Sequence, residues 1–441
     1  MRAARAIVRR LYSAFAYALA PLYCGALLWR GLEERGYWGH FGERLGLGAT
    51  VGARSVWIHA ASVGEVQASA ALVQQLQRCA PGAPLVLTTS TAAGAARGRA
   101  LLREQRVDVR YVPLDLPGSV RRFFDRVTPR LALVLETELW PNLYHECGRR
   151  GVPLVLASAR LSERSARRYR WMRGVFARAL SQCTLVAAQA EADAARFRAL
   201  GAAPERTRVV GNIKFDFRMP AEALARGRAI RDHYGGGRPV WVAGSTHAGE
   251  EEMVLAAHRR VRSAHGQALL MLAPRHAPRF GDVAAWLEQR GVRFARRSRE
   301  GAVDPQTEVL LIDTLGELID FYAAADVVFV GGSLVPIGGH NLLEPAALAR
   351  AIVTGPHQFN AAEIARLLTE RSAIATVQNA RELAAQVAEW LASPATRTSI
   401  GARARAVVEE NRGAVARLME LLAPLLRAPD PQGHPDGGGY G

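Results

Sequence analysis

The chain has 441 residues, which favours two domains of roughly 200 residues each over a single core. Apolar residues make up 49% and charged residues 22%, the composition of an ordinary globular protein. The formal net charge of +17 is unusual and favours a polyanionic partner, such as nucleic acid, an anionic membrane surface or a phosphorylated substrate. The arginines are scattered along predicted helices without interleaved aromatic residues, which weakens the nucleic-acid interpretation.

The first apolar segment, Leu11 to Trp29, contains no charged residue and lies between Arg10 and Arg30. Its length is about enough for one membrane span, although Pro21 is expected to kink a helix there. No small-residue cleavage site follows, which argues against a signal peptide. We therefore predict a non-cleaved membrane anchor over residues 1–33, which either spans the bilayer or lies in its interface.

Short apolar runs alternate with helical patterns from residue 55 onward, which predicts parallel sheets covered by helices on both faces. The expected strands of the first half are Val56–His59, Leu85–Thr88, Val109–Val112, Leu131–Leu135, Leu154–Ala157, Leu185–Ala187 and Arg208–Val210. The expected helices between them are Val66–Arg78, Ser119–Arg126, Leu139–Arg149 and Ser165–Leu180.

The alternation restarts after a break at Gly235-Gly236-Gly237. Its expected strands are Val240–Ala243, Leu269–Leu272, Val309–Ile312, Val327–Val330 and Ala351–Thr354. The fold class is therefore α/β, with two doubly wound Rossmann-like domains after the anchor helix, at 34–210 and 211–426. Residues 427–441 are rich in Pro, Gly and Asp, which predicts a disordered tail.

A glycine-rich turn, Gly331 to Pro345, follows one of these strands and precedes an expected helix beginning at Ala346. Its two glycine pairs could bring backbone N–H groups close to an anion at the helix N-terminus. Asn341 and Glu344 are three residues apart and could face one sugar ligand. The pattern is that of a nucleotide-sugar site, with a tight turn and a helix cap as the alternative.

Two carboxylates follow strands of the first domain. Glu65 is placed where it can act as a general base, but Ser62-x-x-Glu65 is also the pattern of a capping box. Glu136 and Glu138 would point to opposite sides if their strand continued, and Glu138 could instead neutralise a helix N-terminus.

Lys214 is the only lysine in a chain whose other basic residues are all arginine. This favours a site that needs a compact ammonium, where it could stabilise a departing phosphate. An ion pair with Asp216 is the structural alternative.

Three further polar turns follow strands of the second domain, and Arg275 in one of them could hold a phosphate in bidentate fashion. The turns are Gly244–Glu250, Ala273–His276 and Asp313–Leu318. The chain has no phosphate-binding G-x-x-x-x-G-K-[ST] motif, no D-x-D and no H-E-x-x-H. The four cysteines form no C-x-x-C pair, so neither a metal nor a cofactor is predicted.

These motifs together resemble the Kdo (3-deoxy-D-manno-octulosonic acid) transferases of Gram-negative bacteria, and the resemblance covers nearly the whole chain in order. The matching runs are His-Ala-Ala-Ser-Val-Gly-Glu, Glu-Thr-Glu-Leu-Trp-Pro-Asn, Ala-Arg-Leu-Ser, Gly-Asn-Ile-Lys-Phe-Asp, Ala-Pro-Arg-His and Gly-Gly-His-Asn-Leu-Leu-Glu-Pro. The resemblance implies a glycosyltransferase of the GT-B fold at the cytoplasmic side of the inner membrane. It implies transfer of Kdo from CMP-Kdo to the lipid A precursor, with inversion, in lipopolysaccharide synthesis.

The resemblance also assigns residues. It implies that Glu65 accepts a proton and that Glu136 and Lys214 support the transition state. The CMP-Kdo contacts that it implies are Pro274, Arg275, Leu315, Gly316, Glu317, Asn341, Leu342, Leu343 and Glu344. Two alternatives stay open: a GT-B transferase that uses a UDP-sugar and a lipid-linked acceptor, and a membrane-tethered nucleic-acid-binding protein, for which only weak non-specific binding is expected.

Overall fold

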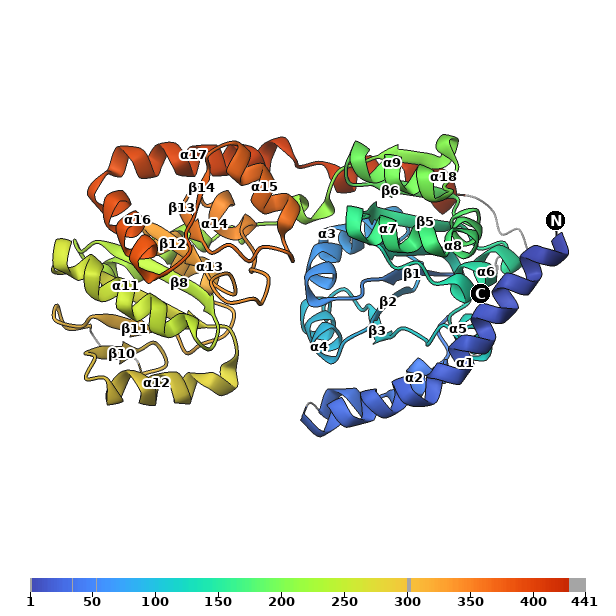
Figure 1. Cartoon of the computed structure of the whole chain (residues 1–441), viewed down its shortest axis with the longest axis horizontal. Coiled ribbons are helices and arrows are strands. Elements are labelled where there is room, and N and C mark those ends of the chain that lie inside the picture. The colour runs from blue at the N-terminus through green and yellow to red at the C-terminus, as the bar shows by residue number, and fades with distance from the viewer. Residues whose placement is uncertain (1, 34, 53, 300–302, 428–441) are drawn as a thin grey trace, which may run out of the picture. The chain divides into compact units, whose positions relative to one another are not determined.

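The computed structural model describes residues 2–33, 35–52, 54–299 and 303–427 (Figure 1). The chain divides into two compact units, one of Met1–Phe217 with Arg412–Gly441 and one of Arg218–Asn411. Each unit contains a seven-stranded sheet in which every paired strand is parallel. The predicted α/β class with two doubly wound domains is thus confirmed.

The first sheet has the strand order β3-β2-β1-β4-β5-β6-β7. Its strands are β1 Ser55–His59, β2 Leu85–Thr89, β3 Asp108–Tyr111, β4 Pro129–Leu135, β5 Leu154–Ala159, β6 Leu185–Ala188 and β7 Thr207–Val209. The order reverses between β1 and β4, and the connections from these two strands therefore leave in opposite directions. Such a switch point leaves a crevice at the carboxyl ends of the strands, where ligands of α/β sheets bind.

Helices cover both faces of this first sheet (Figure 1). They are α1 Arg2–Glu33, η1 Arg35–Tyr37, α2 Phe41–Arg44, α3 Val63–Cys79, α4 Ala92–Leu101, α5 Pro117–Val127, α6 Pro141–Arg150, α7 Glu163–Trp171, α8 Arg173–Leu180, α9 Glu191–Leu200, η2 Pro204–Arg206, η3 Ile213–Asp216 and α18 Ala414–Arg427. The single helix expected over Ser165–Leu180 is two helices, because the backbone leaves helical geometry at Met172 (φ −111°, ψ 32°).

Alternate residues of each buried strand supply the two cores of the first unit. Val56 and Ile58 of β1 face the core beneath α3 and α18, whereas Trp57 faces the core beneath α5 and α6. The rings of Phe123 and Phe124 pack edge-on against Trp57 at centroid distances of 5.0 and 5.9 Å. Both faces of the sheet are apolar for this reason, as a fully covered parallel sheet requires.

The second sheet has the order β10-β11-β9-β8-β12-β13-β14, with its switch point between β8 and β12. Its strands are β8 Val240–Thr246, β9 Leu269–Pro274, β10 Phe294–Arg296, β11 Val309–Leu311, β12 Val327–Val330, β13 Ala351–Thr354 and β14 Ile374–Thr376. The edge strands β10 and β14 were not expected from the sequence, because three residues are too short for an apolar run to stand out.

The helices of the second unit follow the same alternation. They are α10 Ala223–Ile230, a π-helical turn Arg231–Gly235, α11 Glu250–Ala264, η5 Ala277–Arg279, α12 Phe280–Gln289, α13 Leu318–Ala324, α14 Leu343–Ala347, α15 Ala362–Glu370, α16 Ala380–Ala392 and α17 Pro394–Glu410. Trp241 and Phe329, from the two central strands, are fully buried in the main core of this unit.

The division between the units differs from the expected boundary after residue 210 in two ways. The first unit continues through Phe217, and the chain returns to it at Arg412. The returning helix α18 buries Leu418 and Leu422 in the first unit's core, although a single domain was expected over 211–426. Arg427 ends this helix rather than opening a tail, and the remainder of the expected tail, 428–441, lies outside the described residues.

The predicted anchor forms one helix, α1, which continues through Pro21. Its segment Arg9–Leu32 is long and apolar enough to cross a membrane, by length and composition. Many of its large apolar side chains are exposed, among them Leu11, Phe15 and Leu22. Other side chains of α1 contact polar groups of the first unit, namely Asp115 in the segment before α5, Gly118 of α5 and Asn142 of α6.

Candidate functional site

Glu65 lies in the first turn of α3, beside the switch point of the first sheet. Its carboxylate accepts hydrogen bonds from the Ser62 hydroxyl (2.8 Å) and from the Ala61 amide (2.9 Å), while the Ser62 oxygen accepts from the Glu65 amide at 3.3 Å. Ser62 therefore caps the helix, and Glu65 reaches back past the cap in a variant of the capping box. The capping alternative is correct as a description of the fold, and the buried carboxylate lies beside the switch point.

Burial raises the pKa of Glu65 to about 7, with the negative charge of Glu136 as the next largest cause. The hydrogen bonds from Ser62 and Ala61 oppose this rise without cancelling it. A carboxylate of this kind is close to half ionised at neutral pH, which is the range in which a general base exchanges protons efficiently.

Glu136 directly follows β4, at the other strand of the switch point. Its backbone adopts a left-handed conformation (φ 55°), so the strand does not continue and the expected alternation of Glu136 and Glu138 does not apply. The Glu136 carboxylate accepts a hydrogen bond from the Lys214 ammonium at 2.5 Å. A positive φ costs free energy in a residue other than glycine, and such strain is common at functional sites.

Lys214 is held by the short 3₁₀ turn η3. The Asn212 side chain accepts a hydrogen bond from the Lys214 amide (3.0 Å), and Ser158 accepts one from the Ile213 amide (3.3 Å). Lys214 does not pair with Asp216, which was the structural alternative. Asp216 instead accepts from the amides of Gly413 and Val415 at 2.6 and 2.5 Å, and so caps α18.

Glu138 is partly buried in the turn that follows Glu136. Burial and the charge of Glu136 both raise the pKa of Glu138. The alternative role expected for Glu138, at the N-terminus of α6, is filled by Asp115: its carboxylate accepts from the Asn142 and Leu143 amides at 3.0 and 2.8 Å. Asp115 was missed because it lies 26 residues before the helix that it caps.

The glycine-rich turn of the second unit binds a carboxylate of the protein itself. Glu250, at the start of α11, accepts from the amides of Gly332 (2.7 Å), Ser333 (2.9 Å) and Leu334 (2.9 Å). The amides of Gly338 and Gly339 both donate to the Gly332 carbonyl. The expectation that the two glycine pairs present free N–H groups to a ligand is therefore wrong.

The helix after this turn is also different from the expected one. It spans Leu343–Ala347, beginning before Ala346 and ending after little more than one turn. Asn341 accepts from the Leu343 amide at 3.0 Å and donates to the Glu344 carboxylate at 2.9 Å. These two side chains are thus brought together, as their three-residue spacing predicts, but by a short turn with little helix dipole.

Arg275 directly follows β9, next to the switch point of the second sheet, and its side chain is exposed. Arg275 and Glu344 both act electrostatically on the buried hydroxyl of Tyr322: Glu344 reinforces the rise in the Tyr322 pKa caused mainly by burial, and Arg275 opposes it. The turns after β9 and β12 therefore bring their predicted side chains to one region, with Pro274 buried beneath them.

Three histidines from separate turns meet beside Arg275, a cluster that the sequence did not reveal. His247 Nε2 and His340 Nε2 are 2.8 Å apart, their rings are parallel within 6°, and the His276 ring lies edge-on to His247 at 5.2 Å. Burial, reinforced by the charge of Arg275, lowers the pKa of His340 to about 3. The pKa values of His247 and His276 are also lowered, so these imidazoles are neutral at pH 7. Within the described residues, no group of three or more His, Cys, Asp or Glu side chains is placed to hold a metal ion.

The predicted segment Leu315 to Glu317 lies after β11. Leu315 is exposed, and Gly316 has φ 87°, a conformation that favours glycine. The Glu317 carboxylate accepts hydrogen bonds from Arg297 (2.9 Å) and from the Thr314 hydroxyl. This segment shares the carboxyl edge of the second sheet with Arg275, since β11 pairs directly with β9.

Comparison with known proteins places the chain in a family. Residues 39–217 match the family model described as 3-deoxy-D-manno-octulosonic-acid transferase (kdotransferase), and residues 311–423 match a glycosyl transferase-like model. Among solved structures, a UDP-GlcNAc 2-epimerase from Neisseria meningitidis is 11% identical and has a TM-score of 0.57, with 83% of this chain and all of that one covered. The Anabaena protein Alr3699/HepE is 15% identical with a TM-score of 0.54, covering 85% of this chain and all of that one. Both likenesses support the two-domain GT-B-like fold.

Two relatives are more similar in sequence than these solved structures. A 3-deoxy-D-manno-octulosonic acid transferase from Haemophilus influenzae is 42% identical, with 85% of this chain and 87% of the relative covered. One from Bordetella pertussis is 37% identical, with 95% of this chain and 99% of the relative covered. On this identity over most of both lengths, the chain belongs to the 3-deoxy-D-manno-octulosonic acid (Kdo) transferase family.

Proposed function

We propose that this Kdo transferase moves Kdo from CMP-Kdo to the lipid A precursor, lipid IVA, with inversion at the anomeric carbon and with Glu65 as the general base. Family membership makes the chain a glycosyltransferase of lipopolysaccharide synthesis. The observation that carries the finer proposal is a carboxylate of raised pKa, Glu65, at the switch point of the first sheet beside Glu136.

In the proposed step, the Glu65 carboxylate takes the proton of an acceptor hydroxyl while that oxygen attacks the anomeric carbon of Kdo. The bond from this carbon to the CMP phosphate breaks, and CMP leaves with the electron pair. A single displacement inverts the anomeric centre. Glu65 suits this role because its pKa of about 7 lets it be ionised before the step and protonated after it.

The Lys214–Glu136 ion pair supports the same centre from within the first unit. Its 2.5 Å contact fixes the ammonium on one side, and the side chains of both residues are partly exposed. Lys214 retains donors for negative charge that develops in the transition state, while the charge of Glu136 adds to the rise that burial causes in the pKa of Glu65. A guanidinium is longer and planar, which accounts for a lysine in a chain otherwise rich in arginine.

The second unit supplies the proposed CMP-Kdo site. Arg275 is exposed, and within the described residues its guanidinium has no ion pair of the kind that joins the nearby Arg279 to Glu251, so it can clamp the phosphate. Its neighbours at the carboxyl edge are Pro274, the segment Leu315–Glu317 and the turn Asn341–Glu344, in which Leu342 and Leu343 are buried. We expect side chains rather than backbone amides to bind the nucleotide, because Glu250 already accepts from the amides of the glycine-rich turn.

We further propose that α1 lies in the cytoplasmic interface of the inner membrane rather than crossing the bilayer. Tyr12 donates to Asp115 (3.0 Å), Ser13 donates to Asn142 (2.9 Å), and Leu27 is buried further along the helix. A helix fixed to a soluble unit along one face cannot be surrounded by lipid, whereas its exposed apolar face can enter the headgroup boundary. A bilayer-resident, phosphorylated acceptor fits this placement.

Titration calorimetry with CMP and with UDP tests the nucleotide assignment. We expect CMP to bind and Arg275→Gln to weaken it about tenfold, because a charge-assisted contact to the phosphate is lost. Arg405→Gln removes the same charge from an exposed position on α17 and serves as the control. A clear preference for UDP would support the UDP-sugar alternative and contradict the CMP-Kdo assignment.

A further inference from the structure

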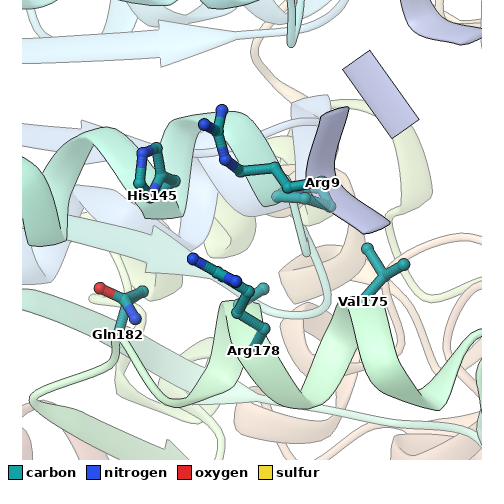
Figure 2. A pocket seen from close by; sticks show the side chains of 7 residues that line it. Arg9, His145, Val175, Arg178 and Gln182 are labelled. Carbon is teal, nitrogen blue, oxygen red and sulfur yellow. The ribbon is translucent and has the colours of Figure 1, made fainter. Parts of the chain in front are cut away.

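Several arginines gather where α1 crosses the first unit, in a region that Glu65, Glu136 and Glu138 do not line. In Figure 2 the side chains of Arg9 from α1 and Arg178 from α8 extend toward the same space, with His145 of α6 and Gln182 beside it. A second, open hollow of about 410 Å³ shares Arg9 and His145 and is also lined by Arg121 of α5. The two hollows form one region, which we call the α1 cationic pocket.

The carboxylates of this pocket are already committed to other arginines. Glu146 accepts from Arg149 (2.6 and 2.9 Å) and from Arg150 (2.7 Å), and Arg150 also donates to Asp125 at 2.5 Å. Two acidic groups therefore balance two arginines. Among the described residues, no further carboxylate lines the pocket to pair with the remaining arginines.

These remaining arginines are Arg9, Arg121 and Arg178. In the described part of the chain, the Arg9 side chain makes one long contact of 3.5 Å, to the Asn142 side chain, and its buried Nε has no hydrogen-bond partner there. Arg121 donates to the Pro117 carbonyl at 3.3 Å. No ion pair joins any of the three to an acidic side chain in the ranges that the structure describes.

The pKa of His145 reflects this excess of positive charge. Burial lowers the pKa of His145, and the positive charges of Arg9 and Arg178 lower it further, despite the nearby Glu146. Because the arginines of the pocket repel one another, a bound anion would stabilise them. An anion with several acceptor oxygens suits them best, because guanidinium groups donate in a planar fork.

We propose that the α1 cationic pocket binds the phosphate of an anionic glycerophospholipid headgroup at the membrane surface. The exposed apolar side chains of Leu11 and Phe15 lie on the other face of the same helix, which would hold α1 at the membrane surface where such lipids lie. This inference rests on the proposed interfacial position of α1 and adds a specific headgroup site to it.

Titration calorimetry with dihexanoylphosphatidylglycerol below its micelle concentration tests the site without a membrane surface. We expect the full-length protein to bind this lipid and to bind dihexanoylphosphatidylcholine at least ~10-fold more weakly. Arg178→Gln and Arg9→Gln should each weaken phosphatidylglycerol binding about tenfold or more, because each removes a charge-assisted contact.

Arg10→Gln is the matched control. Arg10 neighbours Arg9 on α1 and is exposed, but it does not line the pocket, so its loss should change the affinity less than about twofold. Circular dichroism checks that all three variants remain folded; Arg178 makes no side-chain hydrogen bond within the described residues that the substitution would remove.

Three results would overturn the site. The first is no binding of phosphatidylglycerol, and the second is an equal loss of phosphatidylglycerol affinity in Arg9→Gln and Arg10→Gln. The third is inorganic phosphate that binds as tightly as the lipid and depends on Arg178 in the same way. Flotation with pure phosphatidylcholine vesicles separates this proposal from the one it rests on. Wild-type protein that does not float on them contradicts the interfacial position of α1, whereas flotation without headgroup selectivity contradicts only the pocket.

Discussion

Single residues in this protein serve both folding and the proposed chemistry. Glu65 completes a capping box and also sits, buried, against the charge of Glu136. The sequence identified Glu65, Glu136 and Lys214 as candidates, yet it could not assign their partners. Lys214 pairs with Glu136, 78 positions away, because the left-handed turn after β4 directs that carboxylate toward η3. A contact of this length in sequence depends on the sheet order, which no local pattern contains.

The raised pKa of Glu65 predicts a pH dependence of stability. Its carboxyl group has a pKa of about 7 in the folded chain and about 4.3 when unfolded, so the folded state binds more protons between these values. The free energy of unfolding contributed by this group therefore falls as the pH rises through that window, and stays low above about pH 7.

Glu65→Gln does not titrate and should escape this loss. The unfolding free energy of the variant minus that of wild type should increase by on the order of 2 kcal/mol when the pH is raised from about 5 to about 8. Urea unfolding followed by tryptophan fluorescence measures the difference. Glu163→Gln, at an exposed glutamate on α7, should show no such gain. The raised pKa is contradicted if both variants keep the same offset from wild type at both pH values.

Elements were predicted well where their apolar pattern is long and poorly where a distant group determines them. The buried strands and α3, α5 and α6 lie within a few residues of their expected bounds. The glycine-rich turn was assigned to a ligand because its spacing is that of an anion site, but Glu250 of α11 supplies the carboxylate from within the fold. Likewise, nothing local in Ala414–Arg427 indicates that this helix belongs to the first unit.

Asp216 should be important for the attachment of α18. It accepts from the Gly413 and Val415 amides, so Asp216→Ala leaves two N-terminal amides of the helix without their acceptor. We expect a loss of about 1–2 kcal/mol in unfolding free energy and faster amide hydrogen exchange over α18.

Asp232→Ala, at an exposed aspartate of the second unit, provides the control for that comparison. It should leave the exchange of α18 unchanged. Protection of α18 that is identical in Asp216→Ala and wild type would show that apolar packing alone fixes the helix, and would contradict the role given to Asp216.

At the scale of the whole molecule, the βα alternation predicted both parallel sheets, and the motifs at strand ends predicted the family. The chain's return to its first unit was not predictable, since chain order suggests consecutive domains. The two sheets place their candidate residues at their own switch points: Glu65 and Glu136 in one unit, and Arg275, Asn341 and Glu344 in the other. The proposed base and the proposed nucleotide site thus lie on separate cores.

The most direct test of this account is transfer of Kdo from CMP-Kdo, generated in situ, to lipid IVA by purified protein, read by mass spectrometry. Wild type should form the Kdo-bearing product, at a rate that rises with pH through about 7 as Glu65 ionises. Glu65→Gln should lose a factor of ~100 or more while CMP affinity is retained, and Glu163→Gln should match wild type. Equal activity of Glu65→Gln and wild type would contradict Glu65 as the base, and absence of product from the wild type would contradict the substrate assignment.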